Sequence, residues 1–326
     1  MTTTVRWGLV GTGNLANRTI RDIRLTENAD LVAVVSRNQH SADAFAETWG
    51  IPTAYGDYSE FLAASDIDLV YIGTPHGTHF DYAKQAIEAG KNVLCEKAFT
   101  LTAADARELA RLAHEHGVFL MEAMWMRFSP ALERIHQLIS SGAIGDIRFI
   151  QAGMGFAHDV VPGGRFHTPE LGGGAILDMG IYPLTLAHHF LGAPERISAI
   201  GEMWPNGIDL DELMTLEYSS GAVARLASSI SYMLPRTAAI GGTGGVIEID
   251  EPFWAATSIR LRSGTDAPEV IAIEVEGAGY VPMFRAVGET LLAGKLEHPT
   301  NPLSATISVL ETVDEVRRLL AEQQPQ

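Results

Sequence analysis

The sequence has very little cysteine and no long apolar run. Cys95 is the single cysteine among 326 residues, so no disulfide can form within the chain. A chain without disulfides is typical of a reducing compartment. No apolar stretch is long enough to span a membrane, and residues 1–4 lack the basic and apolar segments of a secretion signal. We therefore expect a cytoplasmic protein that has no membrane partner.

Positive charge is also scarce. The chain has 23 lysine and arginine residues against 40 aspartate and glutamate residues, so its net charge is −17. A surface with this charge repels the phosphate backbone, so no nucleic-acid partner is expected. The spacing of histidine, cysteine and carboxylate residues indicates no metal site. With 46% hydrophobic and 19% charged residues, the composition is that of a globular protein, and an enzyme for a small molecule is the default expectation.

Length and patterning predict two domains. A chain of 326 residues is too long for one simple core. In the first part, short continuous apolar segments alternate with helical segments, which favours a parallel sheet covered on both faces. These apolar segments lie at residues 31–36, 68–72, 92–95 and 118–121. We predict an α/β fold whose first domain, residues 1–124, is a doubly wound parallel sheet.

The pattern changes after residue 125. Strand-like segments follow one another and are joined by short turns, such as residues 219–221. Short connections of this kind favour antiparallel pairing. We predict an α+β domain with a mostly antiparallel open sheet over residues 125–326. One broad face of such a sheet needs a cover, and we expect a homodimer or homotetramer to form through it.

A glycine turn near the N-terminus carries the first functional signal. The apolar run at residues 5–10 leads into Gly11-Thr12-Gly13-Asn14-Leu15-Ala16, and a helical segment follows. This order of strand, turn and helix is what a dinucleotide site needs. Gly11 permits the tight turn, Gly13 lets the pyrophosphate approach the backbone, and the helix N-terminus faces the phosphates with its partial positive charge. We therefore predict a Rossmann domain that binds a nicotinamide dinucleotide.

The end of the second strand indicates which dinucleotide binds. Sites for NAD hold the ribose 2′-hydroxyl with an acidic residue at this point, but here the strand ends in Ser36-Arg37-Asn38. Arg37 can pair with a 2′-phosphate, and Ser36 can donate a further hydrogen bond. The alternative is that Arg37 is a solvated arginine at a helix start. Its position directly after the strand favours NADP over NAD.

Two segments carry candidate groups for the chemistry. Lys97 follows Glu96 directly after a strand, so it is expected at the carboxyl edge of the parallel sheet, beside the nicotinamide. Asp178 and Tyr182 are four residues apart, which places them on one face of a helix. A nearby ammonium group lowers the high pKa of a tyrosine. Lys97 and Tyr182 would therefore form a proton-transfer pair for an alcohol–carbonyl interconversion.

Other residues allow two interpretations each. His76 and His79 follow the Gly73-Thr74-Pro75 segment, and either line the cofactor pocket or pack at a helix start. Trp125 and Arg127 lie at the expected domain junction, where small ligands often bind, although tryptophan is usually a core residue. Four residues that flank a glycine-rich segment either determine substrate specificity or are solvated: His158, Arg165, Phe166 and His167.

Taken together, these motifs resemble the glucose–fructose oxidoreductase / inositol dehydrogenase / MocA (Gfo/Idh/MocA) family of NAD(P)-dependent oxidoreductases. The resemblance covers nearly the whole chain and is carried by Gly11 to Ala16, Gly73-Thr74-Pro75 with His79, Glu96-Lys97, and residues 172–183. Tyr182 and residues 121–128 look like the branch that contains glucose–fructose oxidoreductase, dimeric dihydrodiol dehydrogenase and NADP-dependent xylose dehydrogenase. The family's usual proline after the lysine is Ala98 here.

The resemblance implies a function and a set of site residues. It implies that Lys97 contacts the substrate hydroxyl and the nicotinamide, and that Asp178 orients the substrate. We expect an NADP-dependent oxidoreductase that transfers a hydride between nicotinamide and a sugar or other polyhydroxylated compound, with Tyr182 as acid/base. A non-catalytic NADP-binding regulator of the same fold is the alternative. The expected cofactor contacts are Gly11, Thr12, Gly13, Asn14, Leu15, Ser36, Arg37, Thr74, Pro75, His76, His79, Glu96, Lys97, Trp125 and Arg127.

Overall fold

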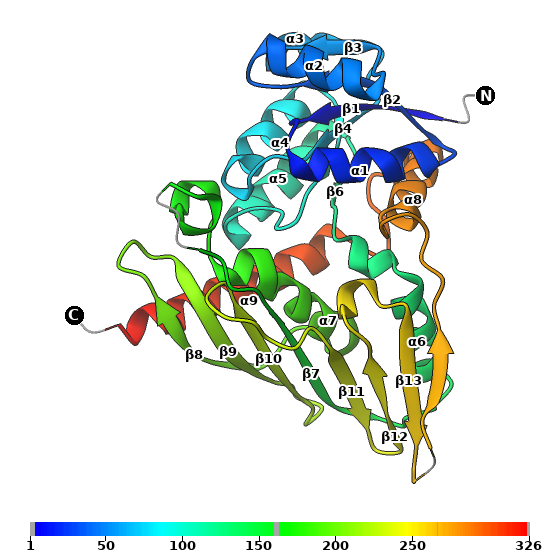
Figure 1. Ribbon diagram of the computed structural model, residues 1–326, viewed down its shortest axis with the longest axis vertical. Coiled ribbons are helices and arrows are strands. Elements are labelled where there is room, and N and C mark those ends of the chain that lie inside the picture. The colour runs from blue at the N-terminus through cyan, green and yellow to red at the C-terminus, as the bar shows by residue number, and fades with distance from the viewer. Residues whose placement is uncertain (1–3, 160–162, 266, 325–326) are drawn as a thin grey trace. The chain divides into compact units, whose positions relative to one another are not determined.

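The computed structural model describes residues 4–159, 163–265 and 267–324, and these form two compact units (Figure 1). The first unit contains Met1–Thr100, Ala104–Trp125 and Glu276–Thr306. The second contains Leu101–Ala103, Met126–Val275 and Ile307–Gln326. The sequence placed the domain boundary between residues 124 and 125, and it did not anticipate that residues 276–306 return to the first unit.

The first unit is built on six strands in the order β3-β2-β1-β4-β5-β6, and all neighbouring strands are parallel. The central strands are almost wholly buried, which explains why they appear in the sequence as continuous apolar runs. The bounds are β1 Val5–Val10, β2 Ala29–Val35, β3 Thr53–Tyr55, β4 Leu69–Ile72, β5 Asn92–Cys95 and β6 Leu120–Glu122. This strand order is that of a doubly wound nucleotide-binding sheet, so the predicted parallel sheet is confirmed.

Helices connect the strands of this unit, and two of them begin at side-chain caps. The Asn38 side chain accepts a hydrogen bond from the Ser41 N–H at the start of α2, and Asp57 accepts one from the Glu60 N–H at the start of α3. Both caps satisfy backbone donors that have no partner within the helix. The bounds are α1 Asn14–Leu25, α2 Gln39–Trp49, α3 Tyr58–Ala63, α4 His79–Glu88 and α5 Ala103–His116.

Residues 276–306 belong to the first unit because they contribute to its core. Helix α8, Val281–Leu292, lies beside α1 (Figure 1). Its Phe284 ring packs edge-on against Trp7 of β1, with 5.3 Å between the ring centroids. The buried Asp22 carboxylate on α1 accepts a hydrogen bond of 2.9 Å from the Tyr280 N–H. These contacts join segments about 250 residues apart, which no local pattern in the sequence can show.

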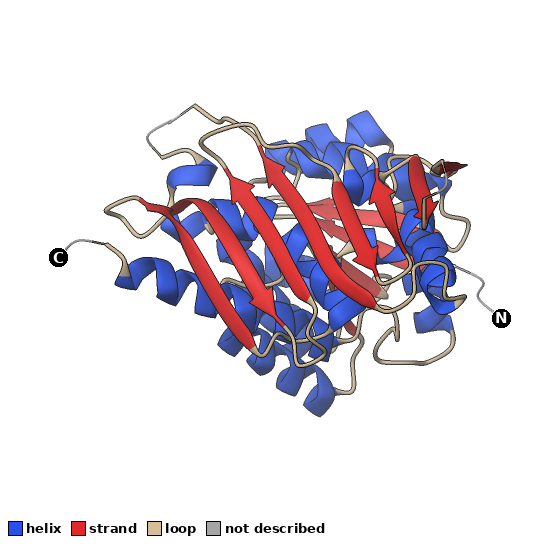
Figure 2. Cartoon of the chain, turned by 90° about the horizontal axis from the view of Figure 1, so that it is seen from below, coloured by secondary structure: helices blue, strands red, loops and turns tan. Residues whose placement is uncertain are grey.

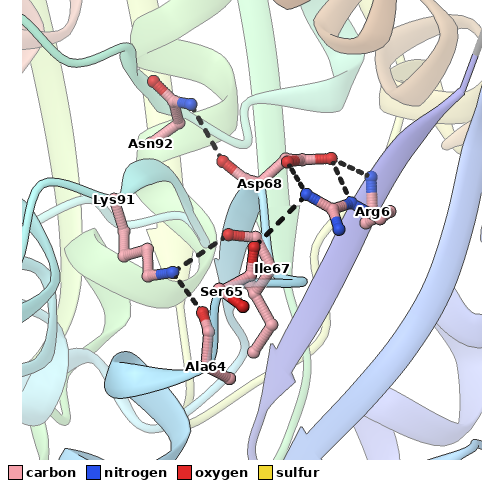
Figure 3. Close-up of polar contacts among 7 residues, drawn as sticks. All are labelled: Arg6, Ala64, Ser65, Ile67, Asp68, Lys91 and Asn92. Carbon is pink, nitrogen blue, oxygen red and sulfur yellow. Dashed lines mark hydrogen bonds and ion pairs between the residues drawn. The ribbon is translucent and has the colours of Figure 1, made fainter. Parts of the chain in front are cut away.

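A polar network ties together the starts of β1, β4 and β5 (Figure 3). The Arg6 guanidinium pairs with both carboxylate oxygens of Asp68, at 2.6 and 2.9 Å. The Lys91 ammonium donates to two backbone carbonyls of the 64–67 turn, at 2.5 and 3.1 Å, and the Asn92 amide donates to the Asp68 carbonyl at 2.8 Å. The polar groups at the amino ends of these strands are therefore occupied by contacts with one another. The glycine turn and the loops after β4 and β5 lie at the opposite edge, where the strands have their carboxyl ends.

The second unit is built on an eight-stranded sheet in the order β14-β13-β12-β11-β7-β10-β9-β8. Among the described strands of this second sheet, β7 and β10 form the only parallel pair, and the other neighbours are antiparallel. The predicted mostly antiparallel sheet is thus confirmed. The bounds are β7 Ile147–Gly155, β8 Arg196–Met203, β9 Asp209–Glu217, β10 Val223–Ser229, β11 Ala238–Gly242, β12 Gly245–Ile249, β13 Ser258–Ser263 and β14 Glu269–Ala272.

Helices of the second unit cover one face of this sheet. A π-helical turn, Ile176–Gly180, leads into α7, Ile181–Leu191, and both pack on β7 and β10. Nearly every residue of this segment is buried, which is consistent with its apolar composition. The other face of the sheet is seen in Figure 2, and no described helix lies over it. The remaining helices are α6 Pro130–Ser140 and α9 Leu303–Glu322.

Within the described residues, no helix combines the length and the apolar character needed to cross a membrane.

Candidate active site

The glycine turn lies between β1 and α1, at the carboxyl edge of the parallel sheet. Gly11 has a φ of +103°, which favours glycine, and a Cβ there would approach the Gly73 carbonyl oxygen to 3.2 Å. At Gly13 a Cβ would meet nothing within 4 Å, so the backbone is open on that side. Helix α1 begins at Asn14, and its N-cap residue Gly13 supplies no side-chain cap. A helix N-terminus without a side-chain cap, beside open space at Gly13, fits a dinucleotide pyrophosphate.

Ser36 and Arg37 follow β2 at the same edge of the sheet. The Ser36 hydroxyl lies 3.4 Å from the Thr12 hydroxyl of the glycine turn, and the Ser36 N–H donates to the Tyr55 carbonyl of β3. The Arg37 side chain is exposed. Arg37 thus follows β2 at the edge of the sheet that carries the glycine turn, and no carboxylate stands at the end of β2.

The loop after β4 carries Thr74, His76 and His79. His76 begins a short 3₁₀ turn, His76–Thr78, and is 5% exposed. The His79 ring is wholly buried, and its two nitrogens lie 2.9 Å from the Ala98 carbonyl oxygen and 2.8 Å from the Thr74 carbonyl oxygen. Burial lowers the pKa of His79. The imidazole therefore joins two loops of the site, which corresponds to the packing interpretation of this residue more than to an exposed ligand contact.

The loop after β5 contains Glu96 and Lys97. The Glu96 carboxyl is buried, accepts a 2.5 Å hydrogen bond from the Tyr71 hydroxyl, and accepts another of 3.2 Å from the Lys97 N–H. Burial raises the pKa of Glu96 to about 7. Lys97 is half-buried, and the peptide bond between Lys97 and Ala98 is cis. Glu96 thus lies beneath the loop and contacts its backbone, whereas Lys97 is partly accessible.

Sequence reasoning missed Glu122, whose carboxylate binds the backbone of the loop after β5. Its carboxylate accepts hydrogen bonds from the Phe99 N–H at 3.2 Å and from the Thr306 hydroxyl at 2.9 Å. Trp125 is 2% exposed, and its ring stacks on Tyr280 with centroids 4.8 Å apart. The only signal for Glu122 is a carboxylate at the end of a buried strand. Trp125 packs within the first unit, while Arg127, 8% exposed, belongs to the second.

Asp178 and Tyr182 lie in the second unit, on either side of the junction between the π-helical turn and α7. The Asp178 carboxylate forms an ion pair with Arg165, with 3.0 Å between Oδ1 and Nη1. The Tyr182 ring lies beside Trp254, with 5.7 Å between the ring centroids. The sequence predicted that both residues lie on a helix, and the structure adds that the first five helical residues have π-helical pairing, which is common at functional sites.

Half-buried aromatic and arginine side chains surround these two residues. His158 stacks on Phe166 at 3.9 Å between centroids, and the Arg165 guanidinium lies 4.2 Å from the Phe166 ring centre. Phe156 lies 6.5 Å from Trp254. The structure thus brings His158, Arg165 and Phe166 together beside Asp178, whereas His167 lies against Trp204, with 4.9 Å between the ring centroids. Whether these residues determine substrate specificity stays a prediction. The structure also adds Trp254, for which the sequence offered no signal beyond its residue type.

The first unit gathers the glycine turn, Ser36, the residues 74–79 and Glu96-Lys97 at the carboxyl ends of neighbouring parallel strands. The second unit carries Asp178 and Tyr182 on a different structural element. Among the residues that the structure describes, no group of three potential metal-binding side chains is found.

Comparison with known proteins establishes the family. Residues 5–124 match the profile described as "Oxidoreductase family, NAD-binding Rossmann fold", and residues 132–248 match the "GFO/IDH/MocA C-terminal domain". The chain belongs to the Gfo/Idh/MocA oxidoreductase family. The predicted family and the NAD(P)-binding Rossmann domain are thereby confirmed.

Relatives with defined names extend over the full chain. Trans-1,2-dihydrobenzene-1,2-diol dehydrogenase of Mus musculus is 34% identical over 331 residues, which cover 99% of this chain and 98% of the relative. The Xenopus tropicalis protein of the same name is 35% identical over 329 residues, covering 98% and 99%. These relatives support the prediction of an oxidoreductase that acts on CH–OH groups.

Solved structures share the fold. KijD10, a 3-ketoreductase from Actinomadura kijaniata in complex with NADP and TDP-benzene, has a TM-score of 0.88 at 25% identity and covers 97% of this chain and 98% of its own. An aldose–aldose oxidoreductase from Caulobacter crescentus complexed with glycerol also has a TM-score of 0.88, at 24% identity, with 98% of both chains covered. The latter likeness concerns the fold alone.

Proposed function

We propose that this chain is an NADP-dependent oxidoreductase that interconverts an alcohol and a carbonyl group on a polyhydroxylated small molecule. The observation that carries the proposal is the pairing of two chemistries in one chain. A glycine turn with open backbone and a neighbouring exposed arginine lies in one unit, and an acid/base tyrosine lies beside a carboxylate and aromatic rings in the other. The bound nicotinamide supplies or accepts the hydride.

The preference for NADP rests on Arg37. Its guanidinium offers paired donors for a 2′-phosphate, and Ser36 adds a hydroxyl next to it. No carboxylate ends β2, so the usual acceptor for a ribose 2′-hydroxyl is missing. The KijD10 structure was solved with NADP, which is in line with this preference.

The three polar residues have distinct roles in the proposed reaction. Tyr182 gives or takes the hydroxyl proton of the substrate. The Lys97 ammonium polarises the substrate oxygen. Asp178 orients the substrate by accepting hydrogen bonds from its hydroxyl groups, with its charge balanced by Arg165 at 3.0 Å.

The substrate class follows from the groups around Asp178 and Tyr182. A carboxylate suits hydroxyl groups, while the half-buried Trp254 ring beside Tyr182 offers an apolar surface. A sugar or a cyclic diol presents both kinds of surface. The curated relatives are named for a dihydrobenzene diol, and KijD10 for a 3-ketoreduction, so both substrate types belong in the first screen.

The proposed activity is tested with the purified protein and a panel of aldoses, inositols, cyclic trans-diols and keto-sugars. Nicotinamide absorbance is followed in both directions with NADP(H) and NAD(H). We expect turnover with at least one hydroxylated substrate and a preference for NADP(H). Tight NADPH binding without turnover of any substrate would instead indicate the non-catalytic regulator.

The role of Tyr182 is tested by Tyr182→Phe. Loss of the phenol hydroxyl should lower kcat by about 10²- to 10⁴-fold, the usual size of a general acid–base contribution. NADPH affinity should stay at the wild-type value, because Tyr182 lies in the unit without the glycine turn. Tyr218→Phe, which removes a buried phenol elsewhere in the same unit, is the matched control. A wild-type kcat in Tyr182→Phe would refute the assignment.

We also propose that the protein is cytoplasmic and forms a homodimer or homotetramer through the open face of the second unit's sheet. Ile200 on β8 and Leu213 on β9 are 61% and 49% exposed on the sheet. They line a shallow hollow of about 610 Å³ together with Leu234 and Pro235. An apolar area of this kind commonly marks an interface. Light scattering should give a multiple of the chain mass, and Leu213→Glu should give the monomer mass.

A further inference from the structure

Two buried carboxylates of β9 lie at the two ends of the π-helical turn that carries Asp178. Asp209 and Glu212 are both wholly inaccessible to solvent. They are three residues apart on one strand of the second unit. Buried carboxylates are costly unless they are paired or hydrogen-bonded, so their presence under an otherwise apolar helical segment requires an explanation.

Asp209 holds the start of the turn. Its Oδ2 accepts a 2.6 Å hydrogen bond from the Ile176 N–H, and its Oδ1 lies 3.3 Å from Nε of Arg317 on α9. Gly174, with a φ of +109°, lies so close to Asp209 that a Cβ there would collide with the carboxylate. The backbone at Gly174 therefore packs directly against the Asp209 side chain. The same side chain accepts the hydrogen bond of the Ile176 N–H, the first donor of the π-helical turn.

Glu212 meets the end of the turn. Its Oε1 accepts a short hydrogen bond from the Ser228 hydroxyl of β10, and a Cβ on Gly180 would lie 3.1 Å from the same oxygen. The last residue of the turn therefore rests on the Ser228–Glu212 pair. Burial raises the pKa of both carboxyls, and the charge of Asp209 raises that of Glu212 further. Asp209 faces the Arg317 guanidinium and the Ile176 N–H, and both contacts favour its charged form.

We infer that Asp209, together with the Ser228–Glu212 pair, positions Asp178 and Tyr182 by clamping both ends of the π-helical turn. Asp178 is the third residue of the turn, and Tyr182 is the second residue of the helix that the turn leads into. None of the three clamp residues, Asp209, Glu212 and Ser228, is placed in contact with substrate. A small displacement of reacting groups lowers turnover strongly, so the clamp acts on catalysis through geometry. The kinetic part of this inference rests on the proposed oxidoreductase function.

Asp209→Asn tests the clamp in the full-length protein. The variant keeps the side-chain shape but replaces the carboxylate, whose two oxygens contact the Ile176 N–H and Arg317, with an amide. We expect faster hydrogen exchange in the peptide that spans residues 174–182, a kcat lower by about tenfold to hundredfold, and an unchanged affinity for NADPH. A substitution that only weakens the fold would reduce the folded fraction and leave kcat per folded molecule and this local exchange pattern unaltered.

Asp250→Asn is the matched control. Asp250 pairs with Arg260 at 2.7 Å and accepts a hydrogen bond from Ser258, away from the turn. Its loss removes a partly exposed ion pair of the same unit, so exchange at residues 174–182 and kcat should match those of the wild type. If Asp250→Asn reproduces the changes seen in Asp209→Asn, the clamp is refuted.

Ser228→Ala keeps the inference testable if Asp209→Asn does not fold. It removes one hydroxyl from beneath Gly180, and we expect a smaller rise in exchange over residues 174–182 with a modest fall in kcat. Wild-type exchange in the folded variant would overturn the clamp, whether or not the protein turns over a substrate. Absence of wild-type turnover with altered exchange would instead reject the oxidoreductase proposal and leave the clamp supported.

Discussion

The two units place their functional residues by different means. In the first unit, the glycine turn, Arg37, and Glu96-Lys97 follow the ends of parallel strands, and parallel strands all end at one edge. In the second, Asp178 and Tyr182 come from a helical segment that is held by side chains of β9, β10 and α9. A site at strand ends is organised by topology, whereas a site on a helix depends on what packs beneath it.

The largest effect is expected when Lys97, the candidate polar group of the first unit's site, is substituted. Lys97→Met should lower kcat by about 10²- to 10⁴-fold, because it removes the ammonium that we propose polarises the substrate oxygen. Steady-state kinetics with the best substrate measures it.

Lys91→Met is the control for Lys97→Met. Lys91 lies at the opposite edge of the same sheet and donates to backbone carbonyls at 2.5 and 3.1 Å (Figure 3). Its loss should lower the free energy of unfolding and leave kcat unchanged. If Lys91→Met slowed turnover as much as Lys97→Met, the two edges of the sheet would not differ in function as proposed.

The second unit should lose stability in acid. Burial lowers the pKa of His188 from 6.5 to about 4, so this imidazole is neutral when folded but takes up a proton when unfolded below pH 6.5. Its contribution is present above that pH and is lost as the pH falls towards 4, by about 3 kcal/mol in total. Urea unfolding at about pH 5 and about pH 8 measures the effect. His188→Gln should flatten the acid limb, and an unchanged limb would contradict the assignment.

The first unit should show the opposite dependence at Glu96. Its pKa rises from 4.5 to about 7 on folding, so between these values the folded protein holds a proton that the unfolded chain has released. Stability therefore falls as the pH rises from 4.5 to 7, by about 3 kcal/mol in total. Glu96→Gln should be more stable relative to wild type at about pH 8 than at about pH 5. Equal differences at both pH values would show that Glu96 does not titrate in this range.

The smallest expected effect concerns cofactor choice. Arg37→Ala should weaken NADPH binding by about 10- to 100-fold, the size of a charge-assisted hydrogen bond, and leave NADH binding unchanged. Arg21→Ala is the control, because Arg21 lies on the exposed face of α1 near Trp49. Fluorescence titration with both cofactors measures the difference. Equal losses for NADPH and NADH would place Arg37 outside the 2′-phosphate site.

Sequence reasoning succeeded where local pattern and topology carry the information. The strands, the glycine turn and the lack of an acidic residue after β2 are local features. The parallel sheet and the positions of Ser36, Thr74 and Lys97 at one edge could therefore be derived from them. The same reasoning identified Asp178 and Tyr182 only as helix neighbours. It missed Glu122 and Trp254, because their contacts join residues that are far apart in the chain.

By itself, the sequence determined the order of strands and helices, the dinucleotide turn and the candidate polar residues, because each depends on residues within a few positions of one another. The tertiary structure decided that residues 276–306 complete the first unit's core, that the helix before Tyr182 begins as a π-helical turn, and that Asp209 lies beneath it. These features depend on burial and on hydrogen bonds between distant segments, and such contacts are formed only when the chain has folded.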